Sequence, residues 1–309
     1  MKKTGYAAFI GGPVLDDYFL LDHWPAQGDK IKGEYLGKLC GGMIGNAARN
    51  CASLGIRTCC FDVVDTDSDG ERIMEALRTD GVDTSFIIRR HSEKKLVSIV
   101  MVSEGERNVF LAGDRPSWNL TLTSEQREFF YQAEYVYSEL LASWIIFDDL
   151  AFYRDLKAHG VKLVFDLEVT MEADEWFERI SCANLVFTNE FGIEKFRESE
   201  SIEAFAQKLF VQGVERLVIT LGEKGCRVIT PEEDFSLPAC RVKAVDTTGA
   251  GDTFNSTFLA CVMRGMDNRT AGVYANAAAS MAVTKPGPAS GITTWEEIRK
   301  FMRENEQKQ

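Results

Sequence analysis

Short apolar runs alternate with amphipathic stretches along this 309-residue chain, and that alternation constrains the fold more than any other feature. Six apolar runs are typical of buried strands: YAAFIGG from Tyr6, TCCFDVV from Thr58, YVYSEL from Tyr135, KLVFDLE from Lys162, NLVFTNE from Asn184 and RLVIT from Arg216. The helical stretches between most of them end on Gly, the residue preferred just past a helix end: IGNAARNCASLG, DGERIMEALRTDG, FDDLAFYRDLKAHG and IEAFAQKLFVQG. This pattern predicts a three-layer α/β/α fold whose mostly parallel central sheet carries helices on both faces.

Two segments interrupt the alternation, at about residues 17–42 and 96–114. The first has strand-like pieces and no helical pattern, and the second is typical of a hairpin around Glu104-Gly105. Both are too long for loops between a strand and a helix. We therefore expect four strands of a small inserted sheet, a lid that closes over a ligand. No linker or repeat divides the chain, so residues 1–309 are expected to form a single domain with this lid.

Charge and cysteine usage exclude several classes of protein. The formal net charge is −12 with no Lys/Arg block, which argues against a nucleic-acid partner. The first apolar run is too short to span a membrane and is broken by Gly11, Gly12 and Pro13. The eight cysteines form no CxxC pair, which is typical of free thiols and predicts a cytoplasmic protein. The three histidines lack ligand spacing, against a His-based zinc site or a Ser-His-Asp triad.

The stretch DTTGAGDTF, Asp246 to Phe254, carries the chemistry, as a tight loop between an expected strand, RVKAV (Arg241–Val245), and a helix. Its glycines precede an amphipathic helix whose first N–H groups lack internal partners and sit at the positive end of the helix dipole. Gly249 and Gly251 let a ligand reach the backbone, which predicts an anion site. A carboxylate beside bound phosphate, Asp252, suits a base that takes a proton from an attacking hydroxyl.

The bare string GAGD is also typical of a Gly-rich turn whose Asp caps a helix. Two other nucleotide-binding patterns are absent from the sequence. There is no GxxxxGK[ST], which excludes a P-loop NTPase, and no GxGxxG, which disfavours a dinucleotide site.

Two stretches together resemble a known family. DTTGAGDTFNSTFLA resembles the C-terminal signature of the ribokinase-like (PfkB) carbohydrate kinases, and GGMIGNAARNCASLG, from Gly41, resembles the N-terminal one in the expected order. The resemblance covers nearly the whole chain, the inserted lid included. It implies ATP- and Mg²⁺-dependent transfer of the γ-phosphoryl group to a hydroxyl of a sugar or sugar acid.

The resemblance also assigns residues to the reaction and to the acceptor. Asp252 matches the catalytic base, and the amides of Gly249, Ala250 and Gly251 match the anion hole. Asp16, rather than its neighbour Asp17, matches an aspartate that binds sugar hydroxyls, and Gly42 and Asn46 fit the same substrate floor. For Asn46, helix capping or a hydrogen bond on the helix face is the alternative.

On the nucleotide side, VITLGEKGC resembles the family's ATP-binding turn, with Thr220, Gly222 and Gly225 near phosphates and ribose. A plain β-hairpin is the alternative. Asn276 matches a residue near the adenine, and packing between helices is its alternative. Asn189 matches the start of the family's N-x-x-E motif and is assigned to the nucleotide site.

The metal ligands are one of the places where this chain departs from the family. The Glu of N-x-x-E, which organises magnesium through water, is replaced by Gly192, so either Glu190 or Glu194 substitutes or the metal shell is built differently. For a monovalent cation, K⁺, the resemblance offers Asp246 and Thr248, with the segment 285–291 as a second arm.

Two rival functions stay open. A nucleoside kinase of the same fold would use an aromatic lid residue to stack on a base, with Tyr18, Phe19 and Trp24 as candidates that also suit lid packing. A non-catalytic ligand-binding relative is disfavoured by the intact Asp252 and glycine loop. The exposed edge of the lid predicts a homodimer through that sheet.

Overall fold

The computed structural model describes residues 5–114, 116–140, 142, 145–167, 176–287 and 292–306. Within these ranges eight strands form one large sheet, in the order β14-β13-β12-β11-β10-β9-β1-β4. In chain order they are β1 (Tyr6–Ile10), β4 (Arg57–Phe61), β9 (Tyr135–Glu139), β10 (Lys162–Leu167), β11 (Leu185–Asn189), β12 (Arg216–Thr220), β13 (Cys226–Ile229) and β14 (Asp234–Leu237). All pairings from β12 to β4 are parallel, and β13 runs antiparallel to both of its neighbours, β12 and β14. The mostly parallel sheet is confirmed.

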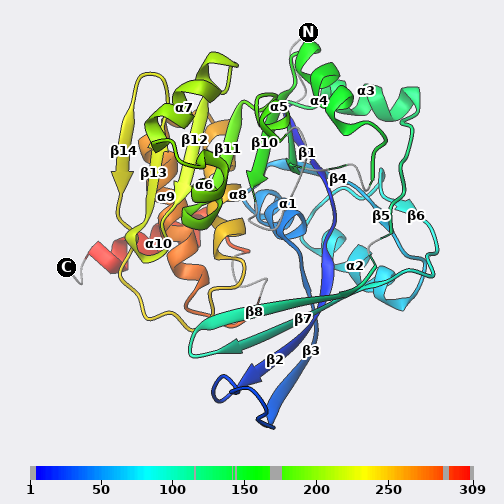
Figure 1. Ribbon diagram of the computed structural model, residues 1–309, viewed down its shortest axis with the longest axis vertical. Coiled ribbons are helices and arrows are strands. Elements are labelled where there is room, and N and C mark those ends of the chain that lie inside the picture. The colour runs from blue at the N-terminus through cyan, green and yellow to red at the C-terminus, as the bar shows by residue number, and fades with distance from the viewer. Residues whose placement is uncertain are drawn as a thin grey trace.

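Helices cover both faces of this sheet (Figure 1). One face packs on α3 (Ser124–Gln132), α4 (Asp149–Ala158), α5 (Trp176–Ile180), α6 (Glu190–Arg197) and α7 (Ile202–Val211). The other packs on α1 (Met43–Ser53), α2 (Ser68–Thr79), α8 (Ala250–Met263), α9 (Asn268–Ala282) and α10 (Trp295–Glu306). Strand β1 shows why: Ala8 and Ile10 join the first apolar cluster, and Ala7 and Phe9 join the second, because successive side chains point to opposite faces. The three-layer α/β/α expectation is confirmed.

The two interrupting segments form a separate sheet of four strands, in the order β3-β2-β7-β8. Its strands are β2 (Val14–Leu21), β3 (Gly33–Gly41), β7 (Leu96–Ser103) and β8 (Glu106–Gly113). Only β2 and β7 are parallel. In Figure 1 this sheet projects from one end of the main body. A short pair, β5 (Val63–Val64) and β6 (Ile88–Arg89), lies apart from both sheets.

One local expectation is wrong. The residues ahead of the glycine loop, Arg241–Val245, are expected to form the strand of a strand–loop–helix unit, but they form none. All five are exposed and no strand of the described residues pairs with them, and the apolar Val242 and Ala244 line a cavity instead of packing in a core. The Val245 amide is held by the carbonyl of Val283, at the end of α9. Among the described residues, none of the helices has the length and apolarity that a bilayer crossing requires.

Candidate active site

The glycine loop opens helix α8. Gly249 is the N-cap residue, with φ of 76° in the left-handed region that a side chain disfavours. A Cβ on Gly251 would meet nothing within 4 Å, so the backbone there faces open space. The Ala250 amide makes only a long contact, 3.3 Å, to the carbonyl of Thr247. The first turn of α8 therefore offers an accessible, electropositive backbone, as an anion site requires.

Asp252 lies half-buried in that first turn, and Asn46 of α1 orients it. The Nδ2 of Asn46 donates to the Oδ2 of Asp252 at 2.8 Å. The other amide atom of Asn46, Oδ1, is buried and accepts no hydrogen bond within the described chain. Asn46 thus does more than pack on a helix face. Its Nδ2 holds Asp252, and its buried Oδ1 remains able to accept a hydrogen bond from another donor.

Asp16 sits on β2, on the face that turns toward the body, opposite Ser98 of β7. It is 5% exposed, and burial raises the pKa of its carboxyl although Ser98 and Arg107 favour the charged form. Asp17 points to the other face, where it accepts a hydrogen bond from the Tyr35 hydroxyl at 2.6 Å. The structure therefore separates the two neighbouring aspartates as the alternation of a strand predicts.

Gly42 links β3 to α1 with φ of 88°. A Cβ there would lie 2.9 Å from the Val14 nitrogen and 3.0 Å from the Gly12 carbonyl oxygen. Gly42 therefore lets the start of α1, which carries Asn46, pass close to the start of β2.

A cavity of about 760 Å³ reaches from the glycine loop to the turn after β12. Of the residues predicted for the nucleotide, it is lined by Thr220, Gly222, Gly225 and Asn276. The turn is a 3-10 helix, Gly222–Lys224, that joins antiparallel β12 and β13. Its backbone is therefore that of a β-hairpin, as the alternative expects, and the same hairpin also forms part of the cavity wall. The cavity brings both predicted anion-binding stretches to one opening.

The side chains of Asn276 and Asn189 both form hydrogen bonds with the backbone of the protein. The Nδ2 of Asn276 donates to the carbonyls of Leu237 and Pro238, each at 3.2 Å, and so fixes the end of β14 at the cavity wall. Asn189 caps α6 and accepts from the Gly192 amide at 2.8 Å. Asn189 is not among the residues that line the cavity.

The residues considered for metals fall into two groups. Glu190 forms an ion pair of 3.0 Å with Lys224 of the turn, and Glu194 pairs with Arg197. The described residues hold no cluster of three or more His, Cys, Asp or Glu arranged for a metal ion.

Asp246 and Thr248 belong to a buried network. The carboxylate of Asp246 accepts from the Thr248 and Gly287 amides, both at 2.8 Å, and from the Tyr18 hydroxyl. Burial raises the pKa of Asp246, but these hydrogen bonds outweigh it and leave the pKa below its usual range. Gly287 belongs to the predicted second arm, whose residues 288–291 lie outside the described ranges.

Sequence reasoning missed two features of the site. Tyr18, considered for base stacking, is 1% exposed and bonded to Asp246, so it cannot stack on a ligand. Behind Asp252, the buried Asp166 carboxylate accepts from the Tyr137 hydroxyl at 2.7 Å and from Asn255 Nδ2 at 2.8 Å. This contact ties α8 to two central strands. Two features of the sequence could have indicated this contact: Asn255 lies one helical turn after Asp252, and Asp166 lies at the end of an apolar run.

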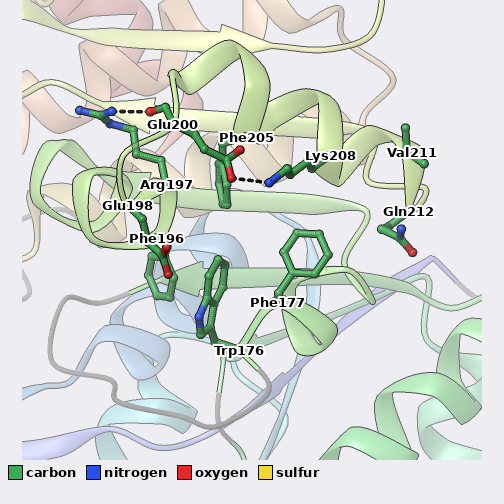
Figure 2. A pocket seen from close by; sticks show the side chains of 10 residues that line it. All are labelled: Trp176, Phe177, Phe196, Arg197, Glu198, Glu200, Phe205, Lys208, Val211 and Gln212. Carbon is green, nitrogen blue, oxygen red and sulfur yellow. Dashed lines mark hydrogen bonds and ion pairs between the residues drawn. The ribbon is translucent and has the colours of Figure 1, made fainter.

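A second cavity, of about 520 Å³, lies among α5, α6 and α7 and contains none of the predicted site residues (Figure 2). Its floor is aromatic, from Trp176, Phe177 and Phe196. The cations on its rim are engaged, because Arg197 donates to the Glu200 carbonyl and Lys208 pairs with the Glu200 carboxylate. It thus offers no unpaired cation for a phosphate.

Comparison with known proteins identifies the family of this chain. The model of the pfkB family carbohydrate kinase matches residues 12–295. The ribokinase of Staphylococcus aureus (strain COL) is 26% identical over 307 residues, which cover 96% of this chain and 99% of that protein.

Two solved structures share the fold. Arabidopsis thaliana ribokinase, complexed with ribose and ATP, gives a TM-score of 0.81 at 23% identity and covers 97% of this chain and 99% of that one. A ribokinase II-like protein from E. coli, in complex with ATP and Mg²⁺, gives 0.79 at 19% identity over 97% and 99%. With the family model matching most of its length, the chain belongs to the pfkB family of carbohydrate kinases, ATP-dependent phosphotransferases with an alcohol group as acceptor.

Proposed function

We propose that this kinase transfers the γ-phosphoryl group of ATP to a hydroxyl of a sugar or sugar acid, with Asp252 as general base. The observation that carries the proposal is the hydrogen bond of 2.8 Å from Asn46 Nδ2 to the Asp252 carboxylate, at the start of α8. A donor to the carboxylate favours its charged form, and only the charged form takes a proton from an attacking hydroxyl.

The backbone of Gly249, Ala250 and Gly251 serves as the anion hole in this proposal. Its support is the left-handed Gly249 and the open space over Gly251. Amides at a helix N-terminus are fixed before the reaction, so they stabilise the charge that develops on the transferring group without reorganising.

Acceptor hydroxyls are held by Asp16 and by the unpaired Oδ1 of Asn46, with Gly42 allowing these elements to approach one another. Asp16 accepts hydroxyl hydrogen bonds, and each such charge-assisted bond contributes about 1.5–3 kcal/mol. Asn46 then touches both the base and the acceptor, which aligns the hydroxyl with Asp252.

The nucleotide occupies the cavity of about 760 Å³, with Thr220, Gly222 and Gly225 beside the phosphates and ribose. Asn276 acts by shaping the wall that faces the adenine, since its amide holds the end of β14. Asn189 supports the site from the start of α6.

Magnesium, when bound with ATP, neutralises phosphate charge. Because Mg²⁺ keeps several waters and takes phosphate oxygens, a few protein carboxylates suffice to hold it. Glu190 fits this role, because it can bind a water of the magnesium ion after it gives up its ion pair with Lys224 of the nucleotide turn. For a monovalent cation such as K⁺, we propose the region of Asp246 and Thr248, where the second arm reaches the carboxylate through Gly287.

The test is ATP turnover against a panel of sugars, sugar acids and nucleosides, with identification of the phosphorylated product. Turnover confined to sugars or sugar acids supports the proposal. Turnover confined to nucleosides supports the alternative kinase, for which the buried Tyr18 supplies no stacking surface. Absence of turnover with the whole panel supports a non-catalytic relative.

We further propose that the chain is one kinase domain, that residues 17–42 and 96–114 act as its lid, and that the protein is a cytoplasmic homodimer. The support for a dimer is β8, an edge strand exposed along its whole length, with Val97 and Phe110 on the outer face of the sheet. All eight cysteines are free, as a reducing compartment favours. A monomer in light scattering at micromolar concentration contradicts the dimer.

A further inference from the structure

Arg107 stands on the inner face of the small sheet, near the turn between β7 and β8. It pairs with Val102 of β7, and Val102 pairs with Leu20 of β2. Paired residues project to one face of a sheet, so Arg107 shares the face that carries Asp16 and Tyr18.

The guanidinium of Arg107 contacts the residue before the glycine loop and acts electrostatically on Asp16 and Tyr18. Its Nη1 donates to the carbonyl of Thr247 at 3.3 Å. Burial raises the pKa of both Asp16 and Tyr18, and in each case the charge of Arg107 acts in the opposite direction. Arg107 is exposed and forms no ion pair with a carboxylate of the described chain. Its positive charge is therefore available to a ligand.

The same turn also reaches the phosphate end of the nucleotide cavity. Thr247, which lines this cavity together with Ala250 and Gly251, donates its amide to the carbonyl of Gly105 at 3.3 Å. Glu106, the neighbour of Arg107, lines the cavity as well. Arg107 thus lies where the edge of the nucleotide cavity meets the face that holds Asp16.

We propose that Arg107 is a further catalytic residue, a cation carried by the small sheet that binds the oxygens of the phosphoryl group during transfer. The inference rests on the proposed function. In the step, the bond from the γ-phosphorus to the ADP oxygen breaks, a bond from the acceptor oxygen to that phosphorus forms, and the acceptor proton passes to Asp252. Arg107 stays protonated throughout and moves from the Thr247 carbonyl to the phosphoryl oxygens. An arginine suits this role because its planar fork matches phosphate oxygens.

The kinetic test compares Arg107→Ala and Arg107→Lys with two controls. We expect Arg107→Ala to lower kcat by at least roughly 10²-fold, toward the contribution of other phosphoryl-binding arginines, with KM for the sugar within about threefold. Arg107→Lys should recover part of the loss. Asn108→Ala tests the neighbouring position on the outer face, and Lys32→Ala removes a positive charge next to β3, at the edge of the sheet opposite β8. Both controls should retain wild-type kcat.

A binding test separates this role from a structural one and from the proposed function itself. MgADP alone should bind wild type and Arg107→Ala equally, whereas MgADP with aluminium fluoride, a mimic of the transferring group, should bind the variant at least roughly tenfold more weakly. Equal weakening with and without fluoride, a rise in sugar KM alone, or kinetics matching Asn108→Ala overturns the inference. Inactivity of the wild type on every acceptor counts against the proposed function instead, and the fluoride comparison still decides on Arg107.

Discussion

Tyr18 and Asp246, 228 positions apart in the chain, are joined by a hydrogen bond from the tyrosine hydroxyl to the carboxylate. The same hydroxyl lies 3.1 Å from Thr248 Oγ1. Tyr18 belongs to the small sheet and Asp246 leads into the glycine loop, so this contact fastens one to the other. Asp16 projects from the same face of β2 two residues earlier, which places the proposed sugar ligand and the fastening contact on one strand.

Removing that contact should cost both stability and activity. Tyr18→Phe leaves the buried Asp246 carboxylate without one donor, and a hydrogen bond to a charged group contributes about 1.5–3 kcal/mol. We expect the free energy of unfolding, measured in urea, to fall by about that amount, and kcat to fall several-fold. Tyr35→Phe, which removes an exposed hydroxyl bonded to Asp17, should change the free energy of unfolding by less than about 0.5 kcal/mol. Equal effects of the two substitutions would contradict the special role of Tyr18.

Replacing the base should affect chemistry and spare binding. Asp252→Asn should lower kcat by at least roughly 10²-fold, the low end for general acid–base catalysis, with KM for ATP little changed because the amides remain. Asp267→Asn is a matched control, since Asp267 also begins a helix and caps it through Thr270. Steady-state kinetics on both variants decides the matter, and an Asp252→Asn enzyme that keeps more than half its activity would show that Asp252 is only a helix cap.

Substitutions of the two neighbouring aspartates of β2 should differ in their effect on the KM for the sugar. Asp16→Ala should raise the sugar KM at least roughly tenfold, equivalent to about 1.4 kcal/mol, and leave the affinity for ATP unchanged. Asp17→Ala should alter neither quantity, because Asp17 faces Tyr35 on the outer side. A larger sugar defect in the Asp17 variant would move the proposed ligand to that residue.

Burial of Asp16 should also appear as a pH-dependent cost in stability. Because burial raises the pKa of Asp16, the folded chain holds its proton more tightly than the unfolded chain does. Stability is therefore lost as pH rises from the ordinary aspartate pKa, about 3.9, through the raised one. Asp16→Asn removes the charge, so it should be more stable than wild type in urea at about pH 7.5, by a margin that shrinks toward about pH 4. A margin independent of pH would refute this account.

A bound monovalent cation should stiffen the loop that Asp246 and Thr248 begin. We predict that K⁺ activates the enzyme several-fold over a bulky organic cation at equal ionic strength, because a nearby cation orders the backbone and offsets phosphate charge. Initial rates in the two salts measure the effect. Identical rates would remove the cation site from the proposal.

Much of the frame was predictable because it depends on local periodicity. The buried parallel strands can be recognised in the sequence as apolar runs, and the glycine loop can be recognised by its residues without side chains. Strand alternation predicts that Asp16 and Asp17 point to opposite faces, and the family resemblance selected Asp16 as the sugar ligand. The contacts of Tyr18 and Arg107 were not predictable, since their partners, Asp246 and Thr247, lie more than a hundred positions away and no local pattern pairs them. The Arg241–Val245 segment was expected to form a strand, but it is exposed, and its apolar Val242 and Ala244 line a cavity instead of packing against a sheet.

The register of β2 has a consequence for how this chain can vary over evolution. Asp16 and Tyr18 share a face only because one residue separates them, so inserting or deleting a single residue there would turn one of them to the opposite side. Length changes are instead expected in the exposed loop from Asp22 to Lys32, between β2 and β3, where no ladder is shifted. Homologous kinases should therefore differ in the length of that loop while keeping the spacing of the two positions, and the loop is the natural place to insert a fluorescent label that reports movement of the small sheet.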